Sequence, residues 1–460
     1  FKLSQSGGVW SETVLHTFCP QSGCADGTNP VSALVLDTAG NLYGTTYAAG
    51  GSGKGGAGAG VVFKLSQSGG MWTETVLYTF CPTNEYRCVD GANPYASLVL
   101  DPAGNLYGTT TYGGNNNYYG TVFEVMQYPQ PLYAKPPDIN GDGRRDIVWR
   151  FTDGTVGEWL MNADGTFQAA GLQAVPNQWQ IAGSGDFNHD GVTDLLWRCI
   201  DATGSVCPAG QVAIWLMNPD GSLKQAVGGQ TVPLGWAIAG TGDFNGDGVA
   251  DILWRCTDAT GSACPTGQVA IWLMNIDGTI KSAGGGQTVP LGWTIAGLGD
   301  FNADGVADIL WRCIDGTGTV CPAGQVGEWL MNPDGSLKAS VGGQIVSPGW
   351  SIAGTGDFNA DGVTDILWRC TDWASAACPA GQAAIWLMNP DGSLKAVVGG
   401  QTVPLTWTIA GTGDFNADGI ADILWRYTDG TVVEWLMNPD GTIKSAVGGQ
   451  VAPLGWAIIE

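Results

Sequence analysis

The stretch DFNADGVADILWR at residues 300–312 decides the fold that we predict for this chain. Its first nine residues place Asp, Asn, Asp and Asp at positions one, three, five and nine, and the Gly at position six permits a tight bend. The apolar residues of DILWR follow at once, and a short apolar run beside turn residues is typical of a buried β-strand. The stretch therefore predicts a bent polar loop that leads into a strand.

The same frame occurs six times in the second part of the chain. Its first residue lies at Asp138, Asp186, Asp243, Asp300, Asp357 and Asp414, with a spacing of 48 residues once and 57 residues four times. The first and last units lack a short insertion that two Cys residues bracket in the other four. Each unit continues with a second apolar stretch such as VAIWLMN at 269–275, a turn such as PDG at 219–221, and a stretch such as GWTIAG at 292–297. We therefore expect four short strands in every unit.

The first part of the chain contains a different repeat. FKLSQSGG occurs at residues 1–8 and 63–70, and NLYGTT occurs at 41–46 and 105–110. Stretches such as TVLYTF at 75–80 alternate in polarity and are separated by Gly and Asn-Pro, which predicts strands and turns. No part of either repeat shows helical periodicity over a useful length.

Four-stranded units that repeat every 40–60 residues or so, with Trp at fixed places, favour the blades of a β-propeller. A β-solenoid is the competing fold, but its repeats are shorter and contain less Trp. We predict an all-β chain with two blades of four antiparallel strands in residues 1–130 and six in residues 131–460. Together they would form one closed propeller of eight blades, with seven or nine left open.

Two strands, at residues 1–3 and 455–459, are left over by this count. Pairing between them would fasten the ring, since unpaired edge strands are normally avoided. The alternative is pairing between chains, which would build a filament.

The composition excludes several classes of protein. Gly makes up 73 of 460 residues but does not recur at every third position, which excludes a collagen. A hydrophobic content of 44% argues against disorder, and no apolar run is long enough for a transmembrane helix. A formal net charge of −24 argues against nucleic-acid binding, because that function needs basic patches.

The twelve Cys residues form six close pairs: Cys19/Cys24, Cys81/Cys88, Cys199/Cys207, Cys256/Cys264, Cys313/Cys321 and Cys370/Cys378. Metal ligation is the alternative, but C-x2-C spacing is absent and only His16 and His189 could contribute imidazoles. We therefore expect disulfides, and with them an oxidising compartment outside the cytoplasm. The chain begins at Phe1 with neither Met nor a signal peptide, so we expect a processed or truncated secreted product.

The six polar loops predict about six calcium ions, because Ca²⁺ prefers six to eight oxygen ligands on a tightly bent loop. The expected ligands are the side chains at positions one, three, five and nine and the carbonyl at position seven. They are Asp138, Asn140, Asp142, Arg144 and Asp146; Asp186, Asn188, Asp190, Val192 and Asp194; Asp243, Asn245, Asp247, Val249 and Asp251; Asp300, Asn302, Asp304, Val306 and Asp308; Asp357, Asn359, Asp361, Val363 and Asp365; and Asp414, Asn416, Asp418, Ile420 and Asp422.

The alternative is six Asx-rich turns that hold no metal. Calcium is favoured because every loop clusters three carboxylates and the pattern offers nothing cationic to offset them. Six Ca²⁺ would change the formal net charge from −24 to about −12. We expect these ions to staple each blade rather than to signal.

The second repeat resembles the FG-GAP/VCBS-type repeats of secreted bacterial proteins and of integrin-type propellers, on the motif Asp-Phe-Asn-x-Asp-Gly-x-x-Asp followed by Ile-Leu-Trp-Arg. The first resembles the GloVer-type tandem repeat, on VF at 122–123 and NLYGTT at 105–110. These resemblances imply a propeller, calcium in the loops and extracellular binding or adhesion. They do not imply a single activity.

Eighteen of the 21 Trp residues form three ladders of six: Trp149, Trp197, Trp254, Trp311, Trp368 and Trp425; Trp159, Trp215, Trp272, Trp329, Trp386 and Trp435; and Trp179, Trp236, Trp293, Trp350, Trp407 and Trp456. Aromatic faces can stack on sugars, but neighbouring blades cover both faces of a blade, which favours core between blades. An Arg follows each Trp of the first ladder, and we expect it to pair across strands with a Glu in three units, at Glu158, Glu328 and Glu434.

Catalysis finds little support in the sequence. G-x-S-x-G, H-E-x-x-H and C-x-x-C motifs are absent, and the loop Asp residues are assigned to calcium. We predict a secreted, calcium-stabilised β-propeller that acts as a non-catalytic extracellular binding, adhesion or matrix module, with a protein or glycan as its partner. The alternatives are a carbohydrate-binding lectin and a structural subunit of an extracellular filament joined through its terminal strands.

Overall fold

The computed structural model contains two compact units, residues Phe1–Pro129 and Gln130–Glu460. It describes residues 2–6, 9–19, 24, 26–36, 41–48, 59–68, 71–80, 88, 91–100, 106–113, 119–125, 132–133, 137–315, 318–371, 378–452 and 456–459. All regular structure in these residues is β-strand, which confirms the predicted all-β class. No helix in the described part of the chain could cross a membrane.

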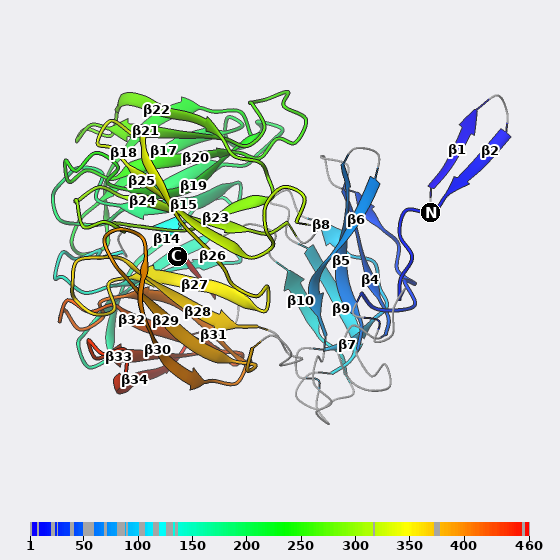
Figure 1. The fold of residues 1–460 in the computed structure, drawn as a ribbon. Helices are drawn as coiled ribbons and strands as arrows, with labels where there is room; N and C mark the ends of the chain where they lie inside the picture. Colours follow the sequence, from blue (N-terminus) through cyan, green and yellow to red (C-terminus); the bar gives the residue numbers. More distant parts are fainter. Residues whose placement is uncertain are drawn as a thin grey trace. The chain divides into compact units, whose positions relative to one another are not determined.

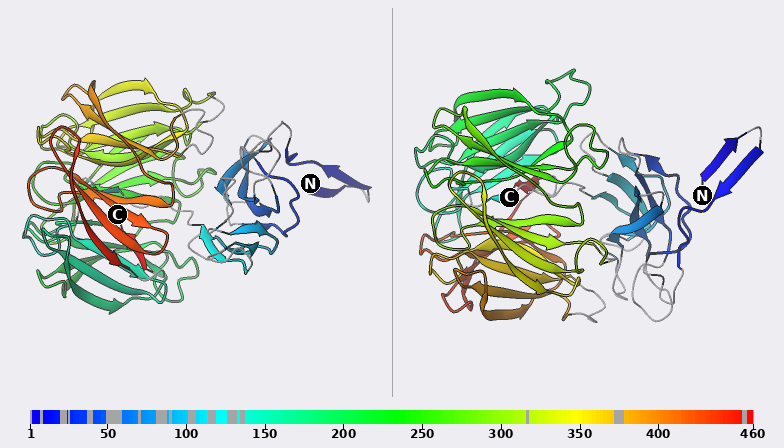
Figure 2. Two further views of the ribbon diagram at one scale, coloured as in Figure 1. Left: turned by 90° about the horizontal axis from the view of Figure 1, so that it is seen from below. Right: turned by 45° about the horizontal axis from the view of Figure 1, so that its top comes forward.

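Five sheets of the second unit each contain four consecutive antiparallel strands, as predicted for a blade. Figures 1 and 2 show the sheets of this unit arranged around a common centre. The strands are β15 (Trp179–Gly185), β16 (Asp194–Cys199), β17 (Gln211–Met217) and β18 (Leu223–Thr231); β19 (Trp236–Gly242), β20 (Asp251–Cys256), β21 (Gln268–Met274) and β22 (Ile280–Thr288); β23 (Trp293–Gly299), β24 (Asp308–Cys313), β25 (Gln325–Met331) and β26 (Leu337–Ile345); β27 (Trp350–Gly356), β28 (Asp365–Cys370), β29 (Gln382–Met388) and β30 (Leu394–Thr402); and β31 (Trp407–Gly413), β32 (Asp422–Tyr427), β33 (Thr431–Met437) and β34 (Ile443–Val451).

The sixth sheet joins the two ends of this unit. It consists of β12 (Ile147–Phe151), β13 (Thr155–Met161) and β14 (Phe167–Ala174), and its fourth strand is β35 (Trp456–Ile459) from the end of the chain. β35 pairs antiparallel with β12, with Ile458 opposite Trp149. The last strand thus occupies the innermost place of the first blade. The chain can close a ring in this way because it enters its first blade at the second strand.

Contacts between blades show that the ring is complete. In every blade an Arg guanidinium lies 4.8 to 5.4 Å from the centre of a Trp ring in the next blade. The last of these contacts joins Arg426 to Trp149 of the first blade. Residues 131–460 therefore form a closed propeller of six blades, and the predicted single ring of eight blades is wrong. The predicted pairing of the two end strands is also wrong, because β35 pairs with β12.

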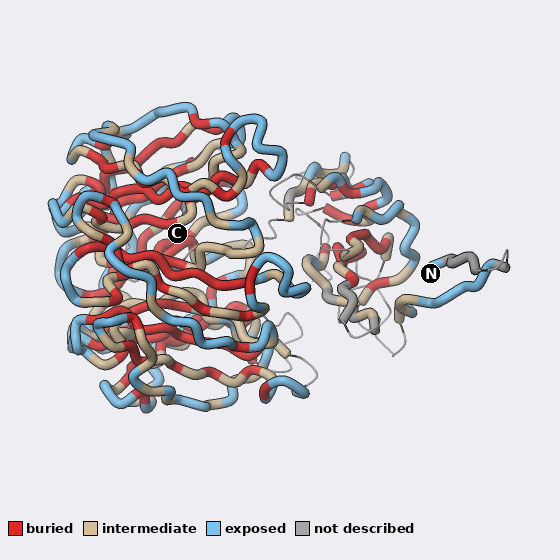
Figure 3. Tube along the Cα trace, turned by 90° about the horizontal axis from the view of Figure 1, so that it is seen from above, coloured by how far each residue is buried: buried red, intermediate tan, exposed pale blue. Residues whose placement is uncertain are grey.

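The core of the propeller lies between adjacent blades. One cluster joins Leu253 and Ile271 of the third blade to Ile309 and Trp311 of the fourth. The second strands are buried along most of their length, whereas the outer strands are largely exposed (Figure 3). A further short strand, β11 (Leu132–Tyr133), runs parallel to the innermost strand β19. The linker that precedes the ring therefore touches the inner edge of the third blade.

The first unit contains two further sheets, which are described here by themselves. One consists of β3 (Val35–Leu36), β4 (Leu42–Thr46), β5 (Val61–Ser68) and β6 (Met71–Thr79). The other consists of β7 (Ala92–Pro94), β8 (Val99–Leu100), β9 (Leu106–Tyr112) and β10 (Val122–Val125). A separate hairpin pairs β1 (Lys2–Ser6) with β2 (Val9–Thr13). Each of the two sheets corresponds to one copy of the first repeat.

Candidate functional site

The six Asp loops lie at one end of the propeller blades. Each connects the first strand of a blade to the second, as residues 186–194 connect β15 to β16. Successive strands of a blade run antiparallel, so the turns between third and fourth strands lie at the same end. The disulfide-bracketed segments connect second and third strands and lie at the opposite end. The predicted site residues of the loops therefore share one face of the ring.

Backbone amides hold the first two carboxylates of each loop. In the second loop, Asp186 Oδ1 accepts a hydrogen bond from the Asp190 N–H at 3.1 Å, and its Oδ2 accepts one from Gly191 at 2.9 Å. Asp190 Oδ1 in turn accepts one from Val192 at 3.1 Å. The other loops repeat this pattern, so the bend inferred from the Asp spacing is present.

The Asp at position nine ties each loop to its blade. Asp194 is fully buried; its Oδ1 accepts a hydrogen bond from Met217 on the third strand, and its Oδ2 accepts one from Phe187. Burial raises the pKa of Asp194 to about 7, against these two donors and with the help of the neighbouring carboxylates of Asp190 and Asp186. The same burial raises the pKa at the other five position-nine residues. The site is short of positive charge at its buried end.

At its exposed end each loop does have a cation, which the sequence analysis missed. Lys224 Nζ lies 2.7 Å from Asp190 Oδ2, and Lys281, Lys338, Lys395 and Lys444 make the same contact with the position-five Asp of their own blades. In the first loop Arg144 contacts Asp142 at 2.9 Å. The expectation that nothing cationic offsets these carboxylates is therefore wrong. The signal was a Lys that recurs just after each Asp-Gly turn, 34 residues beyond its partner in the Cys-containing units.

The donor set of the loops suits a hard cation. Asn188 Oδ1 is buried without a hydrogen-bond partner, while the amide Nδ2 donates to Asp194 Oδ2 at 3.3 Å. A buried amide oxygen among carboxylates is a ligand that Ca²⁺ accepts. Among the described residues no three carboxylates already form a group that could hold a metal ion. Binding would therefore require Asp190 to turn from its Lys towards Asn188.

The loops are also joined to one another. The carbonyl of each first Asp accepts a hydrogen bond from the N–H of position eight in the next loop, as Asp186 does from Ala250 at 2.8 Å. The last loop closes this set, because the Asp414 carbonyl accepts from Arg145 of the first loop at 2.7 Å. Six loops thus form a ring of backbone hydrogen bonds across the blade junctions. Whatever orders one loop also supports its neighbours.

Comparison with known families matches both repeats. Residues 1–133 match the Gloeobacter/Verrucomicrobia repeat, residues 138–197 match an FG-GAP-like repeat, and residues 234–272 match the FG-GAP repeat. The chain carries FG-GAP repeats behind a Gloeobacter/Verrucomicrobia repeat. This confirms the resemblance drawn from the motifs.

Among solved structures, the chain is similar to one described as the mitotic checkpoint complex, at 12% identity and a TM-score of 0.38 over 71% of this chain and 81% of the other. It is similar to BBS1N in complex with ARL6DN at 13% identity and a TM-score of 0.37, over 70% and 83%. It is also similar to the Dos1 propeller at 10% identity and a TM-score of 0.35, over 66% and 68%. No curated protein matches the chain.

The Arg ladder of the FG-GAP propeller clamps blades together. Arg198 Nη2 donates to the carbonyls of Val232, Pro233 and Trp236, in the connection that leads into the next blade, while its guanidinium lies over Trp254. Burial lowers the pKa of Arg198 to about 10. Carbonyl dipoles and the ring face thus replace water around a buried cation.

The predicted Arg–Glu pairs are wrong. Glu158 lies opposite Val148, and Arg150 lies opposite Val156, so the two side chains are out of register. Among the described residues no ion pair involves Glu158, Glu328 or Glu434, each at most 2% exposed. Burial, followed by the charge of nearby Asp residues, raises the pKa of all three carboxyls to about 8.

The Trp ladders of the FG-GAP propeller lie mainly in its interior. The six residues of the first ladder are at most 3% exposed, and each contacts a Trp of the second ladder with ring centres 4.7 to 5.0 Å apart. The third ladder is partly buried through Trp407, and the side chain of Trp456 lies outside the described set. The first ladder is therefore packing between blades rather than a surface for sugars.

The Cys residues of the second unit are joined as predicted, in Cys199–Cys207, Cys256–Cys264, Cys313–Cys321 and Cys370–Cys378, with S–S distances of 2.02 to 2.06 Å. In the first unit Cys19 is joined to Cys24, also as predicted.

The outcome for Cys88 differs from that for these Cys residues. Cys88 is half-buried and disulfide-bonded, as predicted, and its carbonyl accepts a hydrogen bond from the Gly91 N–H at 3.1 Å. Its predicted partner, Cys81, lies outside the described residues, so the partner of Cys88 is not identified. The disulfide bonding of Cys88 is therefore confirmed, whereas its pairing with Cys81 stays a prediction.

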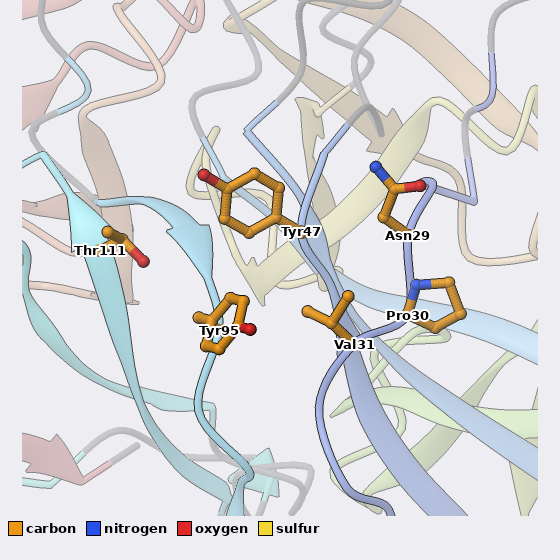
Figure 4. Close-up of a pocket in the computed structure, with 6 residues that line it drawn as sticks. All are labelled: Asn29, Pro30, Val31, Tyr47, Tyr95 and Thr111. Carbon is orange, nitrogen blue, oxygen red and sulfur yellow. The ribbon is translucent and has the colours of Figure 1, made fainter.

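A pocket of about 580 Å³ lies in the first unit, and the sequence analysis missed it. Figure 4 shows the side chains of Tyr47 and Tyr95 around it, with Val31 and Asn29 on the neighbouring segment. The two Tyr rings are 6.1 Å apart at 89°, and Tyr95 is 65% exposed. These residues come from both copies of the repeat. Only the packing of one copy on the other brings them together.

Proposed function

We propose that the chain is a secreted β-propeller protein that calcium stabilises and that acts as a non-catalytic extracellular binding, adhesion or matrix module. The observation that carries this proposal is the ring of six oxygen-rich loops on one face of the propeller. Each loop combines carboxylates raised in pKa with backbone hydrogen bonds to its neighbour. A cation in each loop would relieve the charge and fix the blade junctions together.

The disulfides support placement outside the cytoplasm, because such bonds persist mainly in oxidising compartments. Extracellular calcium sites work at free concentrations of roughly 10⁻⁴ to 10⁻³ M, which suits loops that keep a competing Lys–Asp pair. The non-catalytic part of the proposal is supported by the two His residues, which lie in different units. His16 contacts Asp26, and His189 contacts the Gly248 carbonyl.

Calorimetry with and without chelation tests the calcium part. EDTA should lower the melting temperature of the propeller, and Ca²⁺ but not Mg²⁺ should restore it, because one ion per loop adds about 2–3 kcal/mol at 100-fold saturation. Asp304→Asn should reduce the bound Ca²⁺ by one ion in titration calorimetry. Asp334→Asn, in an exposed turn of the same blade, is the control. An unchanged melting temperature in EDTA would contradict this part.

The binding part has its own test. Labelled protein should bind to intact bacterial cells or their matrix in calcium, and binding should weaken in EDTA as the loop face loosens. Absence of binding under both conditions would contradict a binding or adhesion role while leaving the calcium result intact.

A lectin is a second candidate, and the pocket of the first unit favours it. Exposed Tyr faces stack on pyranose rings, and Asn29 supplies an amide beside them. A glycan array in calcium should then show binding that Tyr95→Ala removes. Trp10→Ala, which changes an equally exposed aromatic residue outside the pocket, should leave binding unchanged. An array without any signal would count against this candidate.

A further inference from the structure

The two copies of the first repeat can be compared position by position. Residues 28–36 read TNPVSALVL and residues 92–100 read ANPYASLVL. Residues 59–63 read AGVVF and residues 119–123 read YGTVF. Equivalent residues of similar type would have similar exposure if each copy had the same surroundings. They do not.

The segment before the central strand of each copy shows the first difference. Leu98 of the second copy is 4% exposed, because it packs in a cluster with Tyr43, Val62 and Phe80 of the first copy. Its counterpart Leu34 in the first copy is 45% exposed. Leu36, two residues further along the same strand face, is 63% exposed. We call the surface of Pro30, Leu34 and Leu36 the entry face.

The opposite side shows the reverse difference. Val62 of the first copy is fully buried against the second copy, whereas its counterpart Val122 is 80% exposed. Ala59 is 7% exposed, and its counterpart Tyr119 is 85% exposed. We call the surface of Val99, Tyr119 and Val122 the exit face; Val99 itself is 64% exposed.

These two faces are complementary because the unit already contains one joint of the same kind. There the exit-side positions of the first copy pack on the entry-side positions of the second. Asn93 N–H donates to the Ala59 carbonyl at 2.6 Å, and Asn93 Nδ2 donates to the Tyr47 carbonyl at 2.8 Å. Ala33 N–H also donates to Ser97 Oγ at 3.2 Å. The free faces thus carry the two halves of a joint whose packing is visible.

The apolar exposure of the first unit is high for its size. Eleven of the 21 large hydrophobic residues that the structure describes as exposed lie within Phe1–Pro129, which is less than a third of the chain. Exposed apolar residues that gather in one region mark interaction surfaces. In the propeller the corresponding blade surfaces are covered, because every blade has a neighbour on both sides.

We propose that a second copy of this chain docks head to tail, with its entry face on the exit face of the first. The occupant is a second copy because each face fits the other and neither fits itself. Such a heterologous contact leaves one free face at each end, so assembly continues into an open stack or a ring. This association uses the first unit alone and does not rest on the calcium proposal.

Sedimentation of the full chain over a range of concentrations tests the proposal. The mass should rise above the 47.8 kDa of one chain as the concentration increases. Val122→Asp, on the exit face, and Leu34→Asp, on the entry face, should each abolish this rise. Val397→Asp, at an exposed Val of the propeller, is the matched control and should leave the association unchanged. Circular dichroism and melting would show that all three variants fold.

A mixture of the two variants decides the geometry. Val122→Asp keeps a working entry face and Leu34→Asp keeps a working exit face, so the mixture should form a dimer although neither variant associates alone. A two-fold contact between like faces would not show this rescue and would overturn the head-to-tail proposal. A single-chain mass for the unaltered protein up to its solubility limit would overturn the proposal altogether.

Discussion

The six-bladed unit and the two-repeat unit are built from four-stranded sheets of similar size, but only the first of them closes. In the propeller Arg426 reaches Trp149, so every blade surface is covered by a neighbour. In the first unit two copies share a single joint, and Leu34 and Val122 remain exposed on either side of it. The burial of a repeat therefore depends less on its own strands than on whether a neighbour exists on each side.

Opening the ring should have the largest effect on this difference. Removal of residues 452–460 deletes β35, so Trp149 loses its partner strand and the propeller gains two free blade surfaces. We expect a loss on the order of 5 kcal/mol or more in the free energy of unfolding, enough to abolish a cooperative transition. Differential scanning calorimetry measures this loss.

Removal of residues 1–13 is the control for this truncation. It deletes the hairpin of β1 and β2, which pair with each other, and should leave the propeller transition in place. If both truncations lowered that transition equally, β35 would not be the closure of the ring.

Weakening one blade junction should have an intermediate effect. Arg198→Ala removes three donated hydrogen bonds and the contact over Trp254, and leaves three carbonyls without their donor. We expect a loss of about 2–3 kcal/mol, measured by denaturant unfolding. Arg144→Ala, on the surface of a loop, should leave stability unchanged. Equal effects of the two variants would contradict the clamp.

Changing a buried Glu should have the smallest effect, and it depends on pH. The pKa of Glu158 is raised in the folded protein to about 8, so folding keeps a proton that the unfolded chain releases near pH 4.5. The stability from this proton is fully present below that pH and is lost as the pH rises to about 8. Glu158→Gln should therefore raise the melting temperature above pH 8 by roughly 2 °C.

The same comparison at low pH supplies the contrast for this variant. Near pH 4 the carboxyl and the amide are both neutral, so the variant and the unaltered protein should melt together. Glu12→Gln, at an exposed position, should show no difference at either pH. A gain for Glu158→Gln that is the same at pH 4 and pH 9 would show that packing, not charge, is responsible.

The Lys of each loop shows where prediction from the sequence stopped. Carboxylates at positions one, five and nine are close in the chain, and their clustering on a bent loop follows from spacing alone. Lys224 meets Asp190 only because the third and fourth strands carry it back to the same end of the blade. The buried Glu158 is a similar case, since strand register places it two residues out of line with Arg150.

The sequence by itself determined what depends on short stretches of chain: four strands per unit, the bent Asp loops, the close Cys pairs of the second unit and the burial of the first Trp ladder. Tertiary structure alone decided which surfaces meet. It assigned β35 to the first blade, limited the ring to six blades, and left the first unit with an uncovered face on each side. The physical reason is that ring closure depends on the packing angle accumulated over all the blades, which no local pattern of residues encodes.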